Sequence, residues 1–163
     1  MTRERRTSTE AADFEQWYED VSPRVYRAVY AIVGKRSAAE DVVADAFTRA
    51  WAKWEGGLAS SPSADGWVWQ VALNLVKRRS RIREFTFSNL PDRRHDDVKP
   101  DGDVWRAVGK LPLRQRQVVV LRYIGGFTEK EIADLLDVSQ GSISASLHKA
   151  RSKLRLKLGE SHG

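Results

Sequence analysis

Hydrophobic residues recur at helical spacing in three stretches of the first half of the chain, residues 13–33, 38–54 and 67–83. A loop rich in glycine, serine and alanine, residues 56–66, separates the second stretch from the third. Each stretch has one apolar face that needs a neighbour. The pattern therefore predicts a helical bundle over residues 13–83.

Turn and capping signals divide the first two stretches. Pro23 predicts a kink or the first turn of a new helix, and Gly34 predicts a helix end. Ser37 and Glu40 have the spacing of a capping box, in which a hydroxyl and a carboxylate each accept a bond from a backbone N–H. Two helices are expected here, after a tail at residues 1–12.

The second half ends in a pattern typical of a helix-turn-helix. Thr128 and Glu131 predict a capping box for one helix, and Ser139 can cap the next. Asp137 stands in the turn, where aspartate tolerates left-handed backbone angles better than most residues. Apolar residues at three- and four-residue steps give the helices a buried face: Ile132, Leu135, Leu136, Ile143, Leu147, Ala150, Leu154 and Leu158.

Between these patterns, residues 84–102 contain two prolines and several turn formers without helical apolar spacing, which predicts a flexible linker. Residues 103–158 then form a second domain, and residues 159–163 a short tail. The predicted fold class is all-α, with two small helical domains joined by the linker.

The last helix has a polar face that carries no acidic residue. Short polar side chains come first and cations follow: Gln140, Ser142, Ser144, His148, Lys149, Arg151, Lys153, Arg155 and Lys157. A recognition helix inserts its N-terminal residues among base edges, while cations further along meet phosphate. The pattern favours duplex-DNA binding over the alternative, a solvated helical hairpin within a bundle.

The stretch 67–83 has a buried stripe and a second face of mixed chemistry. The stripe comprises Val68, Val71, Ala72, Leu75 and Val76. The second face comprises Trp67, Gln70, Asn74, Arg78 and Arg81. An aromatic ring can support an unstacked base, and cations can hold a nucleic-acid backbone, although Trp67 suits a core position equally well. The cations Lys77, Arg78, Arg79, Arg81 and Arg83 predict a phosphate track.

An acidic face distinguishes the helix expected over residues 38–54. Asp41 and Asp45 lie opposite its apolar positions, on a chain whose net charge is +6. Ordinary solvation explains such a face, and so does docking of a basic protein partner. The spacing leaves both interpretations open.

Composition narrows the possible functions. The positive charge favours a polyanionic partner. The absence of cysteine excludes disulfides and thiolate metal sites, and the three histidines are isolated in the sequence. Neither a phosphate-binding glycine loop nor a matched nucleophile and base is recognisable, so we expect neither an enzyme, nor a cofactor, nor a metal site. Apolar runs are too short for membrane insertion, and a cytoplasmic location is expected.

Three stretches together resemble the extracytoplasmic-function sigma factors of bacteria, the two-domain initiation subunits of RNA polymerase. AAEDVVADAFTRAW is similar to the polymerase-docking helix of that family, and GWVWQVALNLVKRRSR to its −10 segment. LPLRQRQVVVLRYIGGFTEKEIADLLDVSQGSISASLHKARSKL is similar to its −35 domain. The resemblance covers about residues 13–158 and extends to the order of the motifs.

The resemblance implies roles for the three faces. Core polymerase would bind Glu40, Asp41 and Asp45. The −10 strand would meet Trp67, Gln70, Asn74, Lys77, Arg78 and Arg81, with loop 59–65 enclosing a flipped base. The −35 duplex would meet Gln140, Ser142, Ser144, His148, Lys149 and Arg151, supported by Arg114, Arg116 and Lys130. An anti-sigma factor is a further partner that the family implies.

Two departures from the family pattern lie in the recognition helix, where Ser144 replaces a usual lysine and Ala145 a usual serine. The promoter sequence therefore does not transfer from relatives. Three alternatives stay open: a conventional helix-turn-helix regulator acting without polymerase, a DNA recombinase or nuclease, and a protein-sequestration module.

Overall fold

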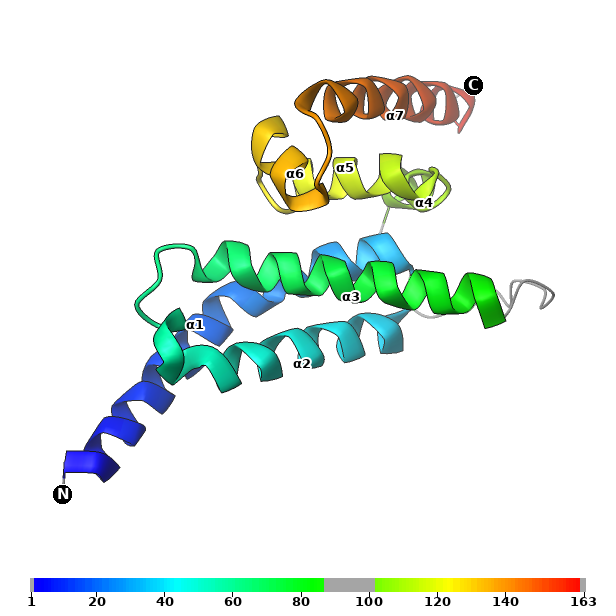
Figure 1. Cartoon of the computed structure of the whole chain (residues 1–163). Coiled ribbons are helices and arrows are strands. Elements are labelled where there is room, and N and C mark those ends of the chain that lie inside the picture. The colour runs from blue at the N-terminus through cyan, green and yellow to red at the C-terminus, as the bar shows by residue number, and fades with distance from the viewer. Residues whose placement is uncertain (1, 87–101, 162–163) are drawn as a thin grey trace.

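The computed structural model describes residues 2–86 and 102–161, with side chains over residues 9–80 and 102–159, and the secondary structure of these residues is helical (Figure 1). The first half contains α1 (Thr2–Val33), α2 (Arg36–Lys53), the π-helical turn η1 (Trp54–Leu58) and α3 (Ala64–Thr86). The second half contains α4 (Asp103–Gly109), α5 (Leu113–Tyr123), α6 (Glu129–Leu136) and α7 (Gln140–Ser161). The all-α prediction is confirmed.

Helix α1 is longer than the sequence pattern predicts. It begins at Thr2, where a tail was expected, and continues through Pro23 without the start of a new helix. The buried side chains of Val25, Val29 and Ile32 hold the following turns against the bundle, which compensates for the backbone bond that proline cannot donate. The helix ends at Val33, and the next residue, Gly34, has a left-handed φ of 71°.

Helix α2 lacks the predicted capping box. Lys35 is its N-cap residue and makes no side-chain cap bond, and Glu40 instead pairs with Arg36 at 3.3 Å. The Glu40 carboxylate therefore pairs with a cation one helical turn earlier, and it does not accept a bond from a free backbone N–H at the start of α2. The apolar face of α2 is buried as predicted, but Trp51 at its edge stays 45% exposed.

The connection from α2 to α3 is more structured than the loop predicted over residues 56–66. The π-helical turn η1 includes Gly57, whose φ of 118° an L side chain would rarely adopt. Trp17 of α1 donates an indole N–H bond of 2.7 Å to Asp65, in the first turn of α3. The start of α3 is thereby tied to α1.

The helix-turn-helix forms as predicted. The Thr128 hydroxyl accepts a bond from the N–H of Glu131 at 3.2 Å, and the Glu131 carboxylate accepts one from the N–H of Thr128 at 2.9 Å. Asp137 has a φ of 54° and lies in the left-handed region. The Ser139 hydroxyl accepts a bond from the N–H of Ser142 at 3.1 Å, which caps α7.

The boundaries of the linker differ slightly from the prediction. Residues 84–86 belong to α3, and α4 begins at Asp103. The rest of the predicted linker, residues 87–101, lies outside the described residues.

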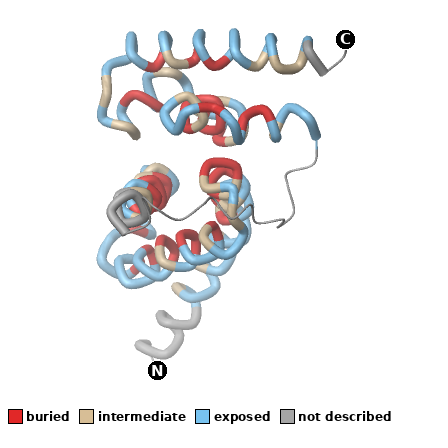
Figure 2. Tube along the Cα trace, turned by 90° about the vertical axis from the view of Figure 1, so that its right-hand side faces the viewer, coloured by how far each residue is buried: buried red, intermediate tan, exposed pale blue. Residues whose placement is uncertain are grey.

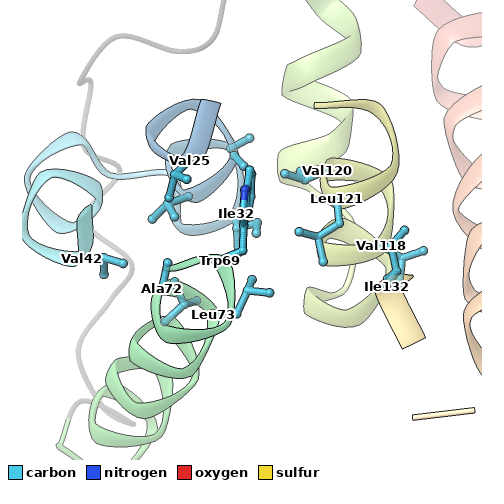
Figure 3. Packing of buried hydrophobic residues seen from close by; sticks show 14 of the residues in the cluster. Val25, Ile32, Val42, Trp69, Ala72, Leu73, Val118, Val120, Leu121 and Ile132 are labelled. Carbon is cyan, nitrogen blue, oxygen red and sulfur yellow. The ribbon is translucent and has the colours of Figure 1, made fainter. Parts of the chain in front are cut away.

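The two helical halves pack against each other and share one hydrophobic core (Figures 1 and 2). Helices α1 and α3 face α4, α5 and α6, and α7 lies on the outer side of the second half (Figure 1). The interface between the two halves is called the seam below. Ile32, Trp69 and Leu73 point across it toward the helix that carries Val120 and Leu121 (Figure 3). This contact explains why Trp69 and Leu73 are buried although they lie off the predicted stripe of α3.

Within the described ranges, no helix has both the length and the apolar character needed to cross a bilayer.

Candidate nucleic-acid interface and acidic face

The predicted recognition face on α7 is open to solvent. The inner side of the helix buries Ile143, Leu147 and Ala150 against α5 and α6, and Leu154 is half-buried. The opposite side exposes every residue predicted to meet the −35 duplex from this helix: Gln140, Ser142, Ser144, His148, Lys149 and Arg151. A duplex can therefore reach this face without any rearrangement of the chain.

Two of the exposed α7 side chains are held by residues from other helices. The Ser144 hydroxyl donates a 2.6 Å bond to the carboxylate of Glu129, in the first turn of α6. Arg151 donates two bonds, of 3.0 and 2.8 Å, to the hydroxyl of Tyr123, and its guanidinium lies 5.8 Å from the centre of that ring. Both contacts restrict the side chains in the free protein.

Sequence patterns gave no indication of Glu129 and Tyr123 as parts of this surface. Tyr123 is exposed at the end of α5, so it belongs to no buried stripe, and Glu129 has the appearance of an ordinary acid in the first turn of a helix. One sequence signal could have indicated Tyr123: it is an aromatic residue off the apolar stripe of its own helix, in a segment that precedes a cationic helix.

Three residues outside α7 were predicted to support the DNA backbone. Arg114 and Lys130 are exposed as that role requires. Arg116 is half-buried at the seam and donates bonds to the carbonyls of Ile32, at 2.7 Å, and Leu111, at 3.0 Å. Burial lowers the pKa of the Arg116 guanidinium. In this conformation Arg116 joins the two halves and does not face solvent as a phosphate contact would.

The predicted −10 face on α3 is divided between solvent and protein. Asn74, Lys77 and Arg78 are exposed, whereas Trp67 is half-buried against an apolar cluster around Trp54. The side chain of Arg81 lies outside the described residues. One part of this face is therefore accessible, and another part packs inside the molecule.

Gln70, at the centre of the same face, is bonded within the protein. Its amide N–H donates to the carbonyl of Leu135 in α6 at 3.0 Å, and its nitrogen lies 3.2 Å from the Asn74 side-chain oxygen, which accepts a second bond. Arg79 of the predicted phosphate track is half-buried and pairs with Asp41 of α2 at 3.6 Å.

The acidic face of α2 consists of Glu40, Asp41 and Asp45. Each carboxylate has a cationic neighbour: Arg36 for Glu40, Arg79 for Asp41, and Arg49 for Asp45 at 2.8 Å. The side chains of Glu40 and Asp41 are 58% and 70% exposed. Exposed pairs of this kind contribute only about 0–1 kcal/mol each, so a basic partner can replace the intramolecular cations at low cost.

No cluster of three or more histidine or carboxylate side chains with metal-binding geometry occurs in the part of the chain that the structure describes. The accessible polar groups on α2, α3 and α7 have the chemistry of contacts to protein and nucleic acid.

Two family models match the two halves in order. Sigma-70 region 2 matches residues 17–85, and sigma-70 region 4 matches residues 101–154. The first match contains the acidic face of α2 and the mixed face of α3, and the second contains the helix-turn-helix.

Curated relatives and solved structures agree with these matches. The RNA polymerase sigma-E factor of Streptomyces antibioticus is 29% identical over 156 residues, covering 91% of this chain and 86% of the relative. The ECF RNA polymerase sigma factor SigL of Mycobacterium tuberculosis is 27% identical and is covered to 93%, with 94% of this chain. The sigma factor RpoE of Bartonella quintana, solved with the anti-sigma factor NepR, has the same fold, with a TM-score of 0.74 at 23% identity, covering 90% of this chain and 97% of that one. The chain therefore belongs to the sigma-70 family of RNA polymerase sigma factors, in its extracytoplasmic-function group.

Proposed function

We propose that this protein binds core RNA polymerase, recognises the −35 and −10 elements of a promoter, and promotes opening of the duplex around −10. The observation that carries the proposal is the order of the two sigma-70 regions along one chain, with the second region presenting an exposed, acid-free recognition face on α7. The role is that of a specificity subunit without catalysis of its own.

Polymerase binding is assigned to the outer face of α2. Glu40, Asp41 and Asp45 form a negatively charged surface on a chain with net charge +6, and a basic helical surface of polymerase is the complementary partner. Such a partner replaces Arg36 and Arg49, which are exposed themselves. The charge of this face steers the encounter, and the neighbouring apolar side chains add contact area.

Recognition of −35 is assigned to α7. Gln140 and Ser142 stand in the first turn, where a recognition helix meets base edges in the major groove. Lys149 and Arg151 follow two to three turns later and contact phosphate. Because Glu129 holds Ser144, a carboxylate also lies close to the recognition face and disfavours contact with phosphate there.

Opening around −10 is assigned to α3 and the loop before it. Asn74 and Arg78 lie on one exposed side of the helix, one turn apart, where an amide can bond a base edge and a guanidinium can hold the backbone. Trp67 is half-buried, and its backbone N–H donates a 2.9 Å bond to the carbonyl of Ser63 in the preceding loop. A base extruded from the duplex would stack or bond in this region, which offsets a few kcal/mol of unstacking.

An anti-sigma factor is proposed as a regulatory partner. The Bartonella quintana relative was solved with NepR, and CnrH, which has a TM-score of 0.65 to this chain, was solved with the cytosolic domain of CnrY. A partner of that class would compete with polymerase for the first half of the chain.

The test is co-purification of the protein with bacterial core RNA polymerase, followed by transcription from a pooled promoter library with and without the protein. Polymerase binding together with new, sequence-selective transcripts supports the proposal. Failure to bind polymerase, together with operator binding by the protein alone, assigns the chain to conventional helix-turn-helix regulators instead. The matched control is a variant with Asp41→Lys and Asp45→Lys, which should lose polymerase binding and retain its fold.

A further inference from the structure

Glu129 and Ser144 form a pair between the two helices of the helix-turn-helix. The Ser144 hydroxyl, on α7, donates a 2.6 Å bond to the Glu129 carboxylate, on α6. The left-handed turn at Asp137 brings the two helices together between these residues. A bond of this length between a hydroxyl and a carboxylate is typical of charge-assisted hydrogen bonds. It fixes both side chains in the free protein.

The Glu129 carboxylate is not part of the cap of its own helix. The capping box of α6 consists of Thr128 and Glu131, whose reciprocal bonds satisfy two backbone N–H groups at the start of the helix. These bonds fix the backbone on both sides of Glu129. The Glu129 side chain reaches instead across to α7, where its carboxylate bonds Ser144.

Ser144 belongs to the side of α7 that would meet the bases. It follows Gln140 by four residues and precedes His148 by four, so the three side chains lie along one side of the helix, and all three are exposed. Ser144 also lies within the first two turns of α7, the part of a recognition helix that enters the major groove. The pair therefore places a carboxylate beside the base-reading positions.

The bond changes what Ser144 can offer to DNA. A serine hydroxyl has one proton to donate and two lone pairs, and an ionised carboxylate only accepts hydrogen bonds. Because the Ser144 proton is directed to Glu129, the hydroxyl presents only lone pairs to any further partner. The pair therefore offers acceptors alone, from two side chains that the bond holds in place.

Acceptors select among the base edges of the major groove. Cytosine presents the N4 amino donor there, whereas guanine presents two acceptors, and thymine presents an acceptor and a methyl group. Adenine presents a donor beside the N7 acceptor, which repels a carboxylate placed across both groups. Phosphate oxygens are also acceptors, and their negative charge repels the carboxylate. Cytosine is thus the base whose edge fits the pair.

We propose that the Glu129–Ser144 pair determines specificity on the −35 face, and that its carboxylate accepts a bond from the N4 amino group of a cytosine in the major groove. This role rests on the proposed function, because it names the base that one part of the recognition face reads. Glu129 meets the base, and Ser144 is a positioning residue that holds the carboxylate.

Site selection from a library with a fully randomised −35 element tests the pair, with the full-length protein in complex with core RNA polymerase. The parent should select cytosine at the contacted position. Glu129→Gln keeps the size of the side chain but adds an amide donor that guanine and thymine accept, so the preference for cytosine should fall about tenfold. Ser144→Ala removes the hydroxyl that holds the carboxylate and should reduce the same preference about threefold.

Each variant has a matched control. Asp134→Asn neutralises a carboxylate at another exposed position of α6, about 140° around the helix from Glu129. Ser152→Ala removes an exposed hydroxyl further along α7. Both controls should select the parental sequence. If Glu129 only joined the two helices, Glu129→Gln would change thermal stability and not the selected base. A parent without cytosine preference, or a Glu129→Gln variant that selects the parental base at every position, overturns the assigned role.

Failure of the proposed function gives a different result. If no complex with core RNA polymerase forms, the proposed function fails, and the same selection is made on duplex DNA with the full-length protein alone, since the recognition face of α7 is exposed in the free chain. A cytosine preference that Glu129→Gln reduces supports the pair in that case as well. Equal selection by the parent and Glu129→Gln, or no selection by either, overturns it.

Discussion

The two helices with DNA-facing chemistry are presented in opposite ways. Helix α7 lies on the outer side of the second half and exposes its whole polar face, whereas α3 lies at the seam, with Gln70 bonded to α6 and Trp69 packed against Phe127 (Figure 1). The polar face of α7 is therefore accessible to a ligand, whereas the centre of the α3 face is bonded to another helix of the same chain. Under the proposed function, the −35 contact needs no rearrangement, whereas Gln70 can meet the −10 strand only when its bond to Leu135 breaks.

The difference has a physical basis in what each helix must bury. Among the described residues, α7 packs against α4, α5 and α6 of its own half, and burial of Ile143, Leu147 and Ala150 covers most of its apolar face. Helix α3 has a wider apolar surface, because Trp69 and Leu73 extend it beyond the predicted stripe. This extra surface requires a cover, which α5 and α6 provide.

The largest expected effect is a loss of stability on truncation of one buried residue that holds α7 against the rest of its half. Leu147→Ala should destabilise the protein by about 2–5 kcal/mol, because Leu147 is 1% exposed and its truncation leaves a cavity. Urea unfolding measures this change. Leu156→Ala, in the same helix but 68% exposed, is the control and should change stability by less than about 0.5 kcal/mol. Equal effects from the two substitutions would contradict the packing of α7.

The next effect concerns the open part of the α3 face. Asn74→Ala together with Arg78→Ala should weaken promoter opening by about 1–3 kcal/mol for each bond to a base that the substitutions remove, while polymerase binding stays intact. Permanganate reactivity of unpaired thymines around −10 measures opening. Gln16→Ala with Arg24→Ala, which removes an amide and a guanidinium from exposed positions of α1, should leave opening unchanged. Failure of the α3 variant to bind polymerase would mean that this face docks protein.

A single substitution tests the α7 face. Gln140→Ala should relax the preference at one −35 position, with about 1–3 kcal/mol at stake for a good base contact. Selection of binding sites from a randomised −35 library, with the polymerase complex of each variant, measures the preference. Ser152→Ala, exposed further along the same helix, should select the parental sequence. An unchanged preference in Gln140→Ala would place the reading residues elsewhere on α7.

The smallest expected effect is a loss of stability on removal of the cap of α6. This helix contacts both DNA-facing helices, because it packs against α7 and its Leu135 carbonyl accepts the bond from Gln70 of α3. Thr128→Ala removes the hydroxyl that caps α6 and should reduce stability by about 1 kcal/mol. Thermal unfolding measures the shift. Thr48→Ala removes a threonine hydroxyl within α2, where it caps no helix and bonds the Ala44 carbonyl, so stability should not fall. A cap without effect would indicate that packing alone positions α6.

Much of this architecture follows from local patterns. The helical halves, the Thr128 capping box, the left-handed Asp137 and the polar face of α7 all follow from residue type and spacing within a few turns. The errors are local as well. Ser37 and Glu40 have capping-box spacing without forming the box, because the helix begins one residue before Ser37 and Glu40 pairs with Arg36.

The sequence by itself determined most of the apolar face of each helix, although it missed Trp69 and Leu73 of α3, and it determined which faces carry chemistry suited to DNA. Both depend on the period of one helix. Only the tertiary structure decided that Gln70 and Arg116, polar residues with the pattern of solvent-exposed side chains, are bonded across the seam. Their acceptors are backbone carbonyls, which every residue possesses, so no sequence signal marks them. Such contacts are fixed only when long-range packing brings two helix ends within reach of a donor.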